Sequence, residues 1–257
     1  MNLKQIIKIL AYSTLLLLPF TSIPTHAQEM NTNQHSTSDR LLVIGDPLPK
    51  ISPHKTIIPL NIFSPSDFEH SLFHTLSLTR TVTVLIAADE EYRAAHPDWK
   101  KITKQMVGKA ANSFRIEYNI NFSVKGYTNW KSDGTNSSSI LDDLNAEWKN
   151  NTQYDFVVGF TKDSNFTAGG IAYVYSAAPQ SGICVVLDQG TISTPYAIQH
   201  EWSHNYGLSH DTSGSDIKCI MNYDYAYSVN YWDPTHNALI KSHLHWYGKK
   251  NWKRILF

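Results

Sequence analysis

One stretch of eleven residues decides what fold and chemistry we expect of this chain: residues 200–210, which read HEWSHNYGLSH. The stretch fits the pattern His-Glu-x-x-His-x-x-Gly-x-x-His at every fixed position. A match by chance in a chain of this composition has a probability below roughly one in ten thousand. The pattern therefore predicts a site in which histidines bind a metal ion.

The first half of the stretch is expected to lie on a helix. Pro195 suits a first helical position, and Thr194 before it is a suitable N-cap. His200 and His204 are four residues apart, so they share one helix face, and their Cβ atoms lie about 5 to 6 Å apart. Two imidazoles at that spacing can converge on one ion at about 2.0 to 2.1 Å. Glu201 points beside the ion, where its carboxylate can take a proton from water.

A third ligand has to come from beyond the helix, because a continued helix would carry the chain past the site. Gly207 can adopt the left-handed conformation that ends the helix and reverses the chain, which delivers His210. Three imidazoles leave one tetrahedral position for water, as in catalytic zinc sites. Such a zinc ion activates water and polarises a carbonyl, with Glu201 as general base.

Five of the other histidines carry no such pattern. A lone histidine is usually a core or surface residue, and that is the role we expect of this group. Its members are His70, His96, His236, His243 and His245.

Upstream of the motif, patterns of strand and helix alternate. Strands are predicted at residues 81–88, 120–127, 154–161, 169–175 and 183–187. Helices are predicted after Asp98 and, from a capping box of Ser139 and Asp142, up to about Trp148. Asp233 with Pro234 indicates a last helix. This order favours a mixed α/β (α+β) domain with a largely parallel sheet.

The N-terminus has the features of an export signal. Residues 1–27 begin with Lys4 and Lys8, continue through an apolar run, and end at Ala27, where cleavage is predicted. Pro19 and Pro24 interrupt the run, which disfavours a membrane anchor. Residues 28–79 are polar and rich in proline, which indicates a pro-segment or an N-terminal extension. The catalytic domain is expected over residues 80–257.

Composition limits the partners of the mature chain. The 257 residues are 42% hydrophobic, and Lys+Arg and Asp+Glu both number 22. A neutral chain lacks the basic field that draws proteins onto nucleic acid or anionic lipid. No second long apolar run follows the leader, so we expect a soluble, secreted monomer that binds neither nucleic acid nor membrane.

The two cysteines, Cys184 and Cys219, would enter an oxidising compartment. A disulfide between them is the simplest expectation, and two buried free thiols are the alternative. A bridge closing a loop of this length would stabilise the fold by about 3 to 4 kcal/mol on the chain-entropy model.

With the segment CIMNY at residues 219–223, the motif resembles the metzincin zinc peptidases, whose Met-turn places a methionine beneath the three ligands. Met221 matches that methionine. Asp211, directly after the third histidine, resembles the adamalysin (reprolysin) branch, as do residues 84–90 and 171–174. The resemblance covers about residues 80–247. Within that range the chain is most similar to the secreted bacterial adamalysin-like endopeptidases.

The resemblance implies a zincin-like catalytic domain. Its expected parts are a twisted, mostly parallel sheet of five strands with an antiparallel edge strand, an active-site helix, and a small C-terminal subdomain ending in a helix. It also implies that peptide substrates pair antiparallel with that edge strand at Gly170, Ile171, Ala172 and Tyr173. Tyr223 would wall the pocket beyond the cleaved bond. With only two cysteines and no disintegrin-like domain, integrin binding is not implied.

Two other functions remain open on the residues alone. One is an exported binding or toxin module with a non-catalytic zinc site, and the other is a zinc hydrolase of a non-peptide amide. The intact Glu201 counts against the first alternative, and the predicted edge strand counts against the second. The function most favoured is a zinc-dependent endopeptidase.

Overall fold

The computed structural model describes residues 79–250 and, before them, the backbone of residues 40–45. The leader predicted at residues 1–27 lies outside the described residues. The same holds for most of the predicted extension at 28–79 and for residues 251–257. All described residues belong to one unit that spans residues 36–257.

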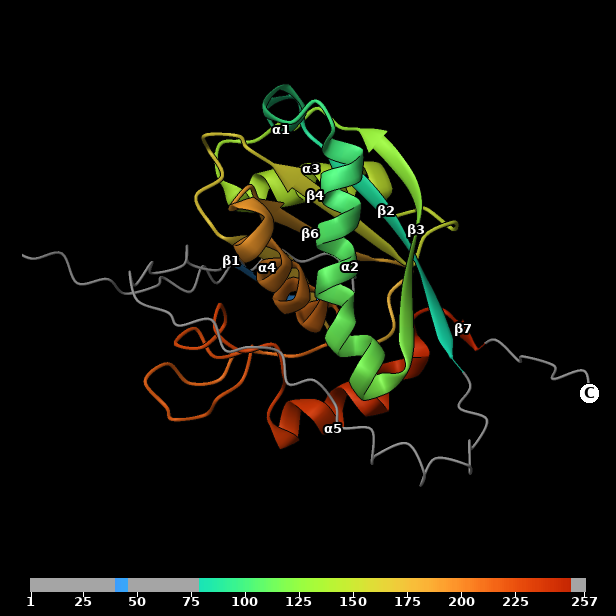
Figure 1. The fold of residues 1–257 in the computed structure, drawn as a ribbon, viewed down its shortest axis with the longest axis vertical. Coiled ribbons are helices and arrows are strands. Elements are labelled where there is room, and N and C mark those ends of the chain that lie inside the picture. Colours follow the sequence, from blue (N-terminus) through green and yellow to red (C-terminus); the bar gives the residue numbers. More distant parts are fainter. Residues whose placement is uncertain (1–39, 46–78, 251–257) are drawn as a thin grey trace, which may run out of the picture. The chain divides into compact units, whose positions relative to one another are not determined.

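Helices and strands alternate through most of the chain (Figure 1). In chain order they are β1 (Arg40–Gly45), β2 (Arg80–Ala88), α1 (Glu90–Ala95), α2 (Trp99–Tyr118), β3 (Ile120–Asn129), α3 (Ser137–Trp148), β4 (Phe156–Thr161), β5 (Gly170–Tyr175), β6 (Gly182–Leu187), α4 (Gly190–Asn205), α5 (Pro234–His243), a 3₁₀ turn (Leu244–Trp246) and β7 (Lys249–Lys250).

The sheet confirms the mixed α/β prediction and is wider than predicted. All five predicted strands are present as β2 to β6, and β3, β2, β4 and β6 pair in parallel. In the described part of the chain the sheet has seven strands, ordered β1-β5-β6-β4-β2-β3, with β7 pairing β2. β5 is antiparallel to β6, as expected. It is not the outermost strand, because β1 pairs along its other side.

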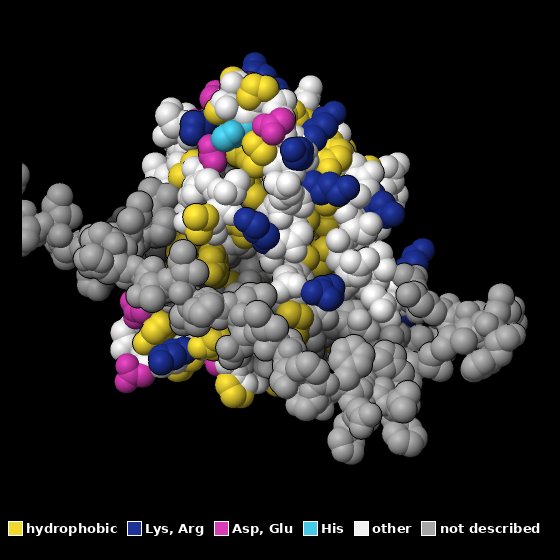
Figure 2. Space-filling view, in the orientation of Figure 1, with side chains coloured by type: hydrophobic (Ala, Val, Ile, Leu, Met, Phe, Trp, Pro, Cys, Tyr) yellow, Lys and Arg dark blue, Asp and Glu magenta, His cyan; other side chains and the backbone are white. Residues whose placement is uncertain are grey.

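Helices cover both faces of the sheet, and the sheet separates two buried cores. Alternate residues of β2 divide between them: Val84 and Ile86 pack with α2 and α4, whereas Leu85 and Ala87 pack with α3. Such alternation is what a strand covered on both faces requires. The face of the molecule that carries α2 has its Lys and Arg side chains spread among uncharged ones (Figure 2).

Two of the predicted helix starts differ in detail. Asp98 precedes α2 as expected, yet its side chain makes no capping hydrogen bond. The capping box of α3 is formed by Asn136 and Ser139, not by Ser139 and Asp142. The Asn136 side chain accepts from the Ser139 N–H, and the Ser139 hydroxyl receives the Asn136 N–H. Asparagine is as good an N-cap as serine, so Asn136 and Ser139 could each cap the helix, and the sequence does not distinguish the two starts.

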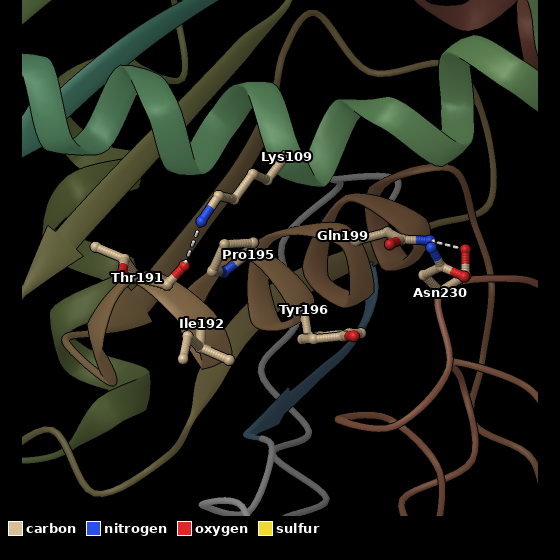
Figure 3. Close-up of a pocket in the computed structure, with 7 residues that line it drawn as sticks. All are labelled: Lys109, Thr191, Ile192, Pro195, Tyr196, Gln199 and Asn230. Atoms are coloured by element: carbon tan, nitrogen blue, oxygen red, sulfur yellow. Dashed lines mark hydrogen bonds between the residues drawn. The ribbon is translucent and has the colours of Figure 1, made fainter. Parts of the chain in front are cut away.

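The active-site helix α4 starts earlier than predicted. It begins at Gly190, which leaves Pro195 inside the helix, not at its first position. A proline in a helix interior removes one backbone donor and leaves the carbonyl four residues earlier without its usual partner. That carbonyl, on Thr191, accepts instead from Lys109 Nζ of α2 at 3.0 Å (Figure 3). The contact between α2 and α4 therefore makes the proline tolerable.

The C-terminal part confirms the predicted helix and then continues. The Asp233 side chain caps α5 by accepting from Thr235 N and His236 N, and Pro234 occupies the first turn. After α5 the chain returns to the sheet, where β7 pairs antiparallel with the start of β2. Within the described residues, the 3₁₀ turn and this two-residue strand follow the predicted last helix. Arg80 fixes this return by donating from Nη1 to the carbonyls of residues 247 and 248.

The predicted disulfide is not formed: Cys184 and Cys219 are both buried free thiols. Cys184 lies in the middle of β6, under the helices, where burial raises the pKa of its thiol. Cys219 lies in the loop before Met221, with its Sγ 3.4 Å from His236 Nδ1. The two sulfurs have different packing partners, which sequence spacing cannot reveal.

No helix within residues 79–250 is both long enough and apolar enough to span a bilayer.

Candidate metal centre and active site

Three histidine nitrogens converge at the end of α4. His200 Nε2 lies 3.1 Å from His204 Nε2 and 3.0 Å from His210 Nε2, and the last two are 3.0 Å apart. Nitrogens bound to one tetrahedral zinc ion at about 2.0 to 2.1 Å are separated by about 3.3 Å, so the observed triangle is close to that spacing. The group fits a zinc site.

Backbone carbonyls orient the two helical imidazoles. His200 Nδ1 lies 2.6 Å from the Ile220 carbonyl oxygen, and His204 Nδ1 lies 2.7 Å from that of Leu208. A carbonyl can only accept, so each Nδ1 carries the hydrogen and each Nε2 presents a lone pair to the site. This second contact is typical of metal-binding histidines, because it fixes the ring and its tautomer.

The turn after α4 places the third histidine. Gly207 has a φ of +88°, as its predicted left-handed role requires. Its N–H donates to the His204 carbonyl at 2.7 Å, and Leu208 N donates to the Ser203 carbonyl at 3.2 Å. These two bonds form a Schellman motif, which ends a helix and redirects the chain. The redirected chain brings His210 to the two helical histidines.

Glu201 lies beside the histidines and is completely buried. Its side chain lies against Gly170, the first residue of β5, where an added Cβ would lie 2.2 Å from Glu201 Oε1. The side chain of Glu201 therefore occupies the space that any larger residue at position 170 would need. The carboxylate therefore lies against the start of β5, the strand with which a peptide substrate is expected to pair.

The loop with Met221 is bonded to two parts of the site. The Ile220 carbonyl of this loop contacts His200, as described above. The Met221 carbonyl accepts a hydrogen bond from Asp211 N at 3.0 Å. Met221 itself is completely buried. Asn222, a residue that the sequence analysis did not single out, donates from Nδ2 to the carbonyls of Ser215 and Ile217 and so holds the intervening loop.

Tyr223 packs against the histidines. Its ring centroid lies 4.2 Å from that of His210 and 6.3 Å from that of His200. The prediction that Tyr223 walls a substrate pocket stays a prediction. The structure places the ring next to the site.

Asn205 positions β5 and β6 relative to the active-site helix, and the sequence analysis missed it. It is completely buried and follows His204 directly. Its Nδ2 donates to the carbonyls of Tyr173 and Ile183 at 2.9 and 3.2 Å. Its own carbonyl accepts from Tyr247 Oη at 2.7 Å. In the sequence, Asn205 is marked only by its amide side chain, and it stands at a position of the motif where any residue fits. The motif therefore does not indicate its role.

Two hollows of the described surface lie away from the histidines. A cavity of about 260 Å³ lies between α2 and the first half of α4 (Figure 3). Among its lining residues are Lys109, Pro195 and Gln199. A second, of about 480 Å³, lies at the start of β2 and includes Thr83 and Asp155. Neither includes a histidine, so neither is the metal site.

The fold and the three-histidine site together define a metallopeptidase of the zincin class. Residues 78–233 match the family Reprolysin_5, described as metallopeptidase family M12, and this match covers more than half of the chain. The chain belongs to this family.

Other comparisons add the fold alone. A comparison with curated proteins gave no match. Among solved structures, 98 chains are similar. One, titled "Structure of a chaperone-substrate complex", aligns with a TM-score of 0.50 and 16% identity over 66% of this chain. The present chain covers only 35% of that relative's length.

Proposed function

We propose that this protein is a secreted, zinc-dependent endopeptidase. The observation that carries the proposal is the triangle of Nε2 atoms of His200, His204 and His210, with Glu201 buried beside it. Membership of metallopeptidase family M12 supports it independently. Export by the leader at residues 1–27 is part of the proposal.

The chemistry divides between the ion and the protein. Zinc, when bound by the three histidines, supplies Lewis acidity that polarises the scissile carbonyl and acidifies water. Glu201 takes the proton of the attacking water at its carboxylate and passes it to the leaving nitrogen.

The backbone of β5 is the proposed binding surface for substrate. Pairing through Gly170, Ile171, Ala172 and Tyr173 would hold an extended peptide by main-chain hydrogen bonds, which tolerate many sequences. Because β5 begins next to Glu201, a peptide strand paired with it passes the carboxylate. This arrangement suits cleavage within a chain.

We further propose that the extension at residues 28–79 is an inhibitory pro-segment. β1, which belongs to it, already pairs antiparallel with β5: Val43 pairs with Tyr173, Ile44 with Ala172 and Gly45 with Ile171. These are the residues proposed for substrate pairing, and β1 runs in the direction expected of a substrate. A peptide can therefore reach β5 only after β1 has left, which removal of the extension would achieve.

A casein digestion assay on the matured protein tests the function. We expect cleavage that stops when a chelator removes the metal and returns when zinc is added back. A matured sample that binds zinc and cleaves no protein substrate would favour an exported binding module. Cleavage of small amides without cleavage of casein would favour a different hydrolase.

A further inference from the structure

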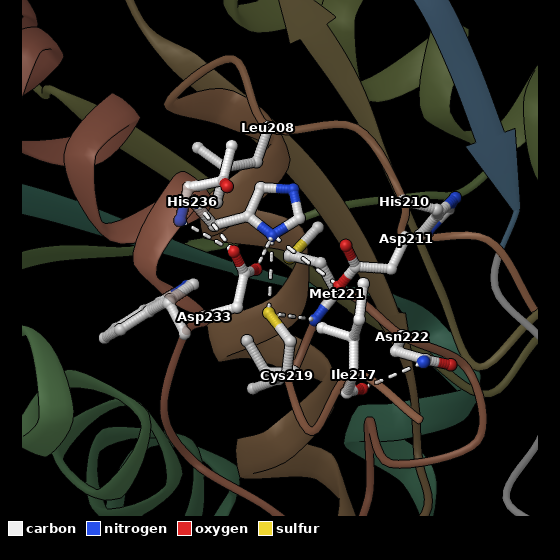
Figure 4. A network of polar contacts seen from close by, with 12 residues as sticks. Leu208, His210, Asp211, Ile217, Cys219, Met221, Asn222, Asp233 and His236 are labelled. Atoms are coloured by element: carbon white, nitrogen blue, oxygen red, sulfur yellow. Dashed lines mark hydrogen bonds and ion pairs between the residues drawn. The ribbon is translucent and has the colours of Figure 1, made fainter. Parts of the chain in front are cut away.

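A second group of potential metal ligands lies behind the third histidine. It consists of Asp211, Cys219, Asp233 and His236, and one ligand atom from each lies within 4.8 Å of the other three (Figure 4). The four residues come from the loop after His210, the segment before Met221 and the start of α5. We call this group the Asp-Cys-Asp-His cluster.

The cluster is almost closed to solvent. The side chain of Cys219 is fully buried, the carboxylates of Asp211 and Asp233 are each 11% exposed, and the His236 ring is 10% exposed. Within residues 79–250, both carboxylates form their ion pairs with the same basic group, His236. Two nearly enclosed carboxylates and a thiol thus share one imidazole, and enclosed polar groups are costly unless each one is paired.

Hydrogen bonds within the cluster satisfy only part of this arrangement: His236 and the Cys219 thiol both bond to Asp233, and Asp211 is left over. Three groups approach the single atom His236 Nδ1: Cys219 Sγ at 3.4 Å, Asp211 Oδ2 at 3.7 Å, and Asp233 Oδ2, which is the nearest. A ring nitrogen carries at most one hydrogen, so it can serve one of the three. Asp211 Oδ2 is buried and has no hydrogen-bond partner. A cation at the centre could take one atom from each group.

We propose that the Asp-Cys-Asp-His cluster binds a second zinc ion, separate from the ion at His200, His204 and His210. A thiolate, an imidazole and two carboxylates are all ligands that zinc accepts, and four protein ligands make a closed, structural site. Coordination by Cys219 releases its thiol proton to solvent and forms the Zn–S bond.

The surrounding contacts suit a bound ion. Asp233 caps α5 with Oδ1, which accepts from Thr235 N at 2.7 Å, so its Oδ2 is turned toward the cluster. Cys219 Sγ receives the N–H of Met221 at 3.4 Å, a contact that supports a thiolate ligand. Burial raises the pKa of the Cys219 thiol, whereas a coordinated cation favours the thiolate.

The consequence of the second ion is mechanical. Asp211 directly follows the third histidine, and Cys219 is two residues before Met221. An ion bound to both, and to the start of α5, would fix the loop that presents His210. The inference does not require peptidase activity, because it concerns metal content alone.

Cobalt substitution of the full-length chain tests the proposal. Cobalt bound to a thiolate gives a near-ultraviolet charge-transfer absorption, whereas cobalt bound only to imidazoles does not. The histidine site has no sulfur ligand, so this band reports the second site alone. We expect the band in the wild-type protein, two metal ions per chain by elemental analysis, and one ion and no band in Cys219→Ala.

Two controls separate the second site from the active site. Cys184→Ala removes the other thiol and should retain the band and both ions. His204→Ala should lower the metal content to one ion and retain the band, which keeps the test independent of the proposed function. A wild-type chain with one ion and no band would show that the cluster is only a hydrogen-bonded network, and a band that survives Cys219→Ala would also overturn the proposal.

Discussion

Gly170 lies against Glu201 so closely that a methyl group on Gly170 would overlap the carboxylate, since its Cβ would lie 2.2 Å from Oε1. This relationship joins the strand proposed to bind substrate to the residue proposed to move protons. A substitution at position 170 can therefore displace the Glu201 carboxylate without changing a metal ligand.

Gly170→Ala should therefore lower turnover strongly while zinc content stays at the wild-type level. Displacing a catalytic group by about 1 Å costs on the order of 100-fold in rate. Casein cleavage and elemental analysis on the same sample measure both quantities. Gly108→Ala is the matched control, because an added Cβ there meets nothing within 4 Å. An alanine at 170 with full activity would show that the position of Glu201 is not critical.

Proline substitutions in β1 test the pro-segment. In Val43→Pro/Ile44→Pro, at least one of the two lost N–H groups faces β5, because consecutive N–H groups of a strand point to opposite sides. We expect the uncut full-length variant to cleave casein faster than the uncut wild type, and the β5 amides to exchange hydrogen faster. Mass spectrometry confirms that the chain is uncut.

Ser36→Pro serves as the control, since Ser36 lies in the same extension but before the paired residues. It should behave as the wild type does. An uncut wild-type chain that is already as active as the double variant would refute inhibition by β1.

Gly207→Ala should destabilise the fold and weaken zinc binding. Its φ of +88° is costly for alanine by about 1 to 2 kcal/mol, and its Cβ would lie 2.9 Å from the Tyr175 carbonyl oxygen. Gly214 separates these two causes, because it has a φ of +79° with nothing within 4 Å. We expect Gly214→Ala to cost less in urea unfolding and to leave zinc affinity unchanged. Equal losses in both variants would contradict the role given to the Gly207 turn.

The Asp188 carboxylate should contribute to the free energy of unfolding at neutral pH, and this contribution should be lost at acidic pH. Burial acts to raise its pKa, but hydrogen bonds from His96 at 2.8 Å and from Lys162 at 3.1 Å outweigh burial and hold the pKa below its usual value. A lowered folded-state pKa means that the contribution is present above the unfolded pKa of about 3.9 and is lost as pH falls through the folded value.

Asp188→Asn should therefore reduce the free energy of unfolding at neutral pH, by about 1 to 3 kcal/mol. The difference from wild type should shrink as the pH falls below the usual range of an aspartate. Urea unfolding of both proteins across that range provides the measurement. A difference independent of pH would show that the charge of Asp188 is not what stabilises the fold.

The sequence predicted those parts of the site that depend on local spacing. His200 and His204 are four residues apart on a helix and therefore share one face. A glycine turn then redirects the chain to His210. Both features can be predicted from the spacing within the motif. β2 to β6 were likewise predicted from patterns that repeat within each segment. These features need no knowledge of distant contacts.

Features that depend on distant contacts could not be predicted. Pro195 inside α4 is tolerated because Lys109, on another helix, bonds the Thr191 carbonyl. Cys219 faces His236 and not Cys184, which turned an expected disulfide into part of a cluster. His236 was expected to be an ordinary core or surface residue, because its partners come from three separate segments.

The most direct measurement of the central claim is the turnover of Glu201→Gln, made together with its zinc content. Glutamine keeps the shape of the side chain but cannot accept a proton, so we predict wild-type zinc content and a loss of about 100- to 10,000-fold in casein turnover. A variant that holds its zinc and keeps most of its turnover would contradict the assignment of Glu201 as the general base of a zinc-dependent peptidase.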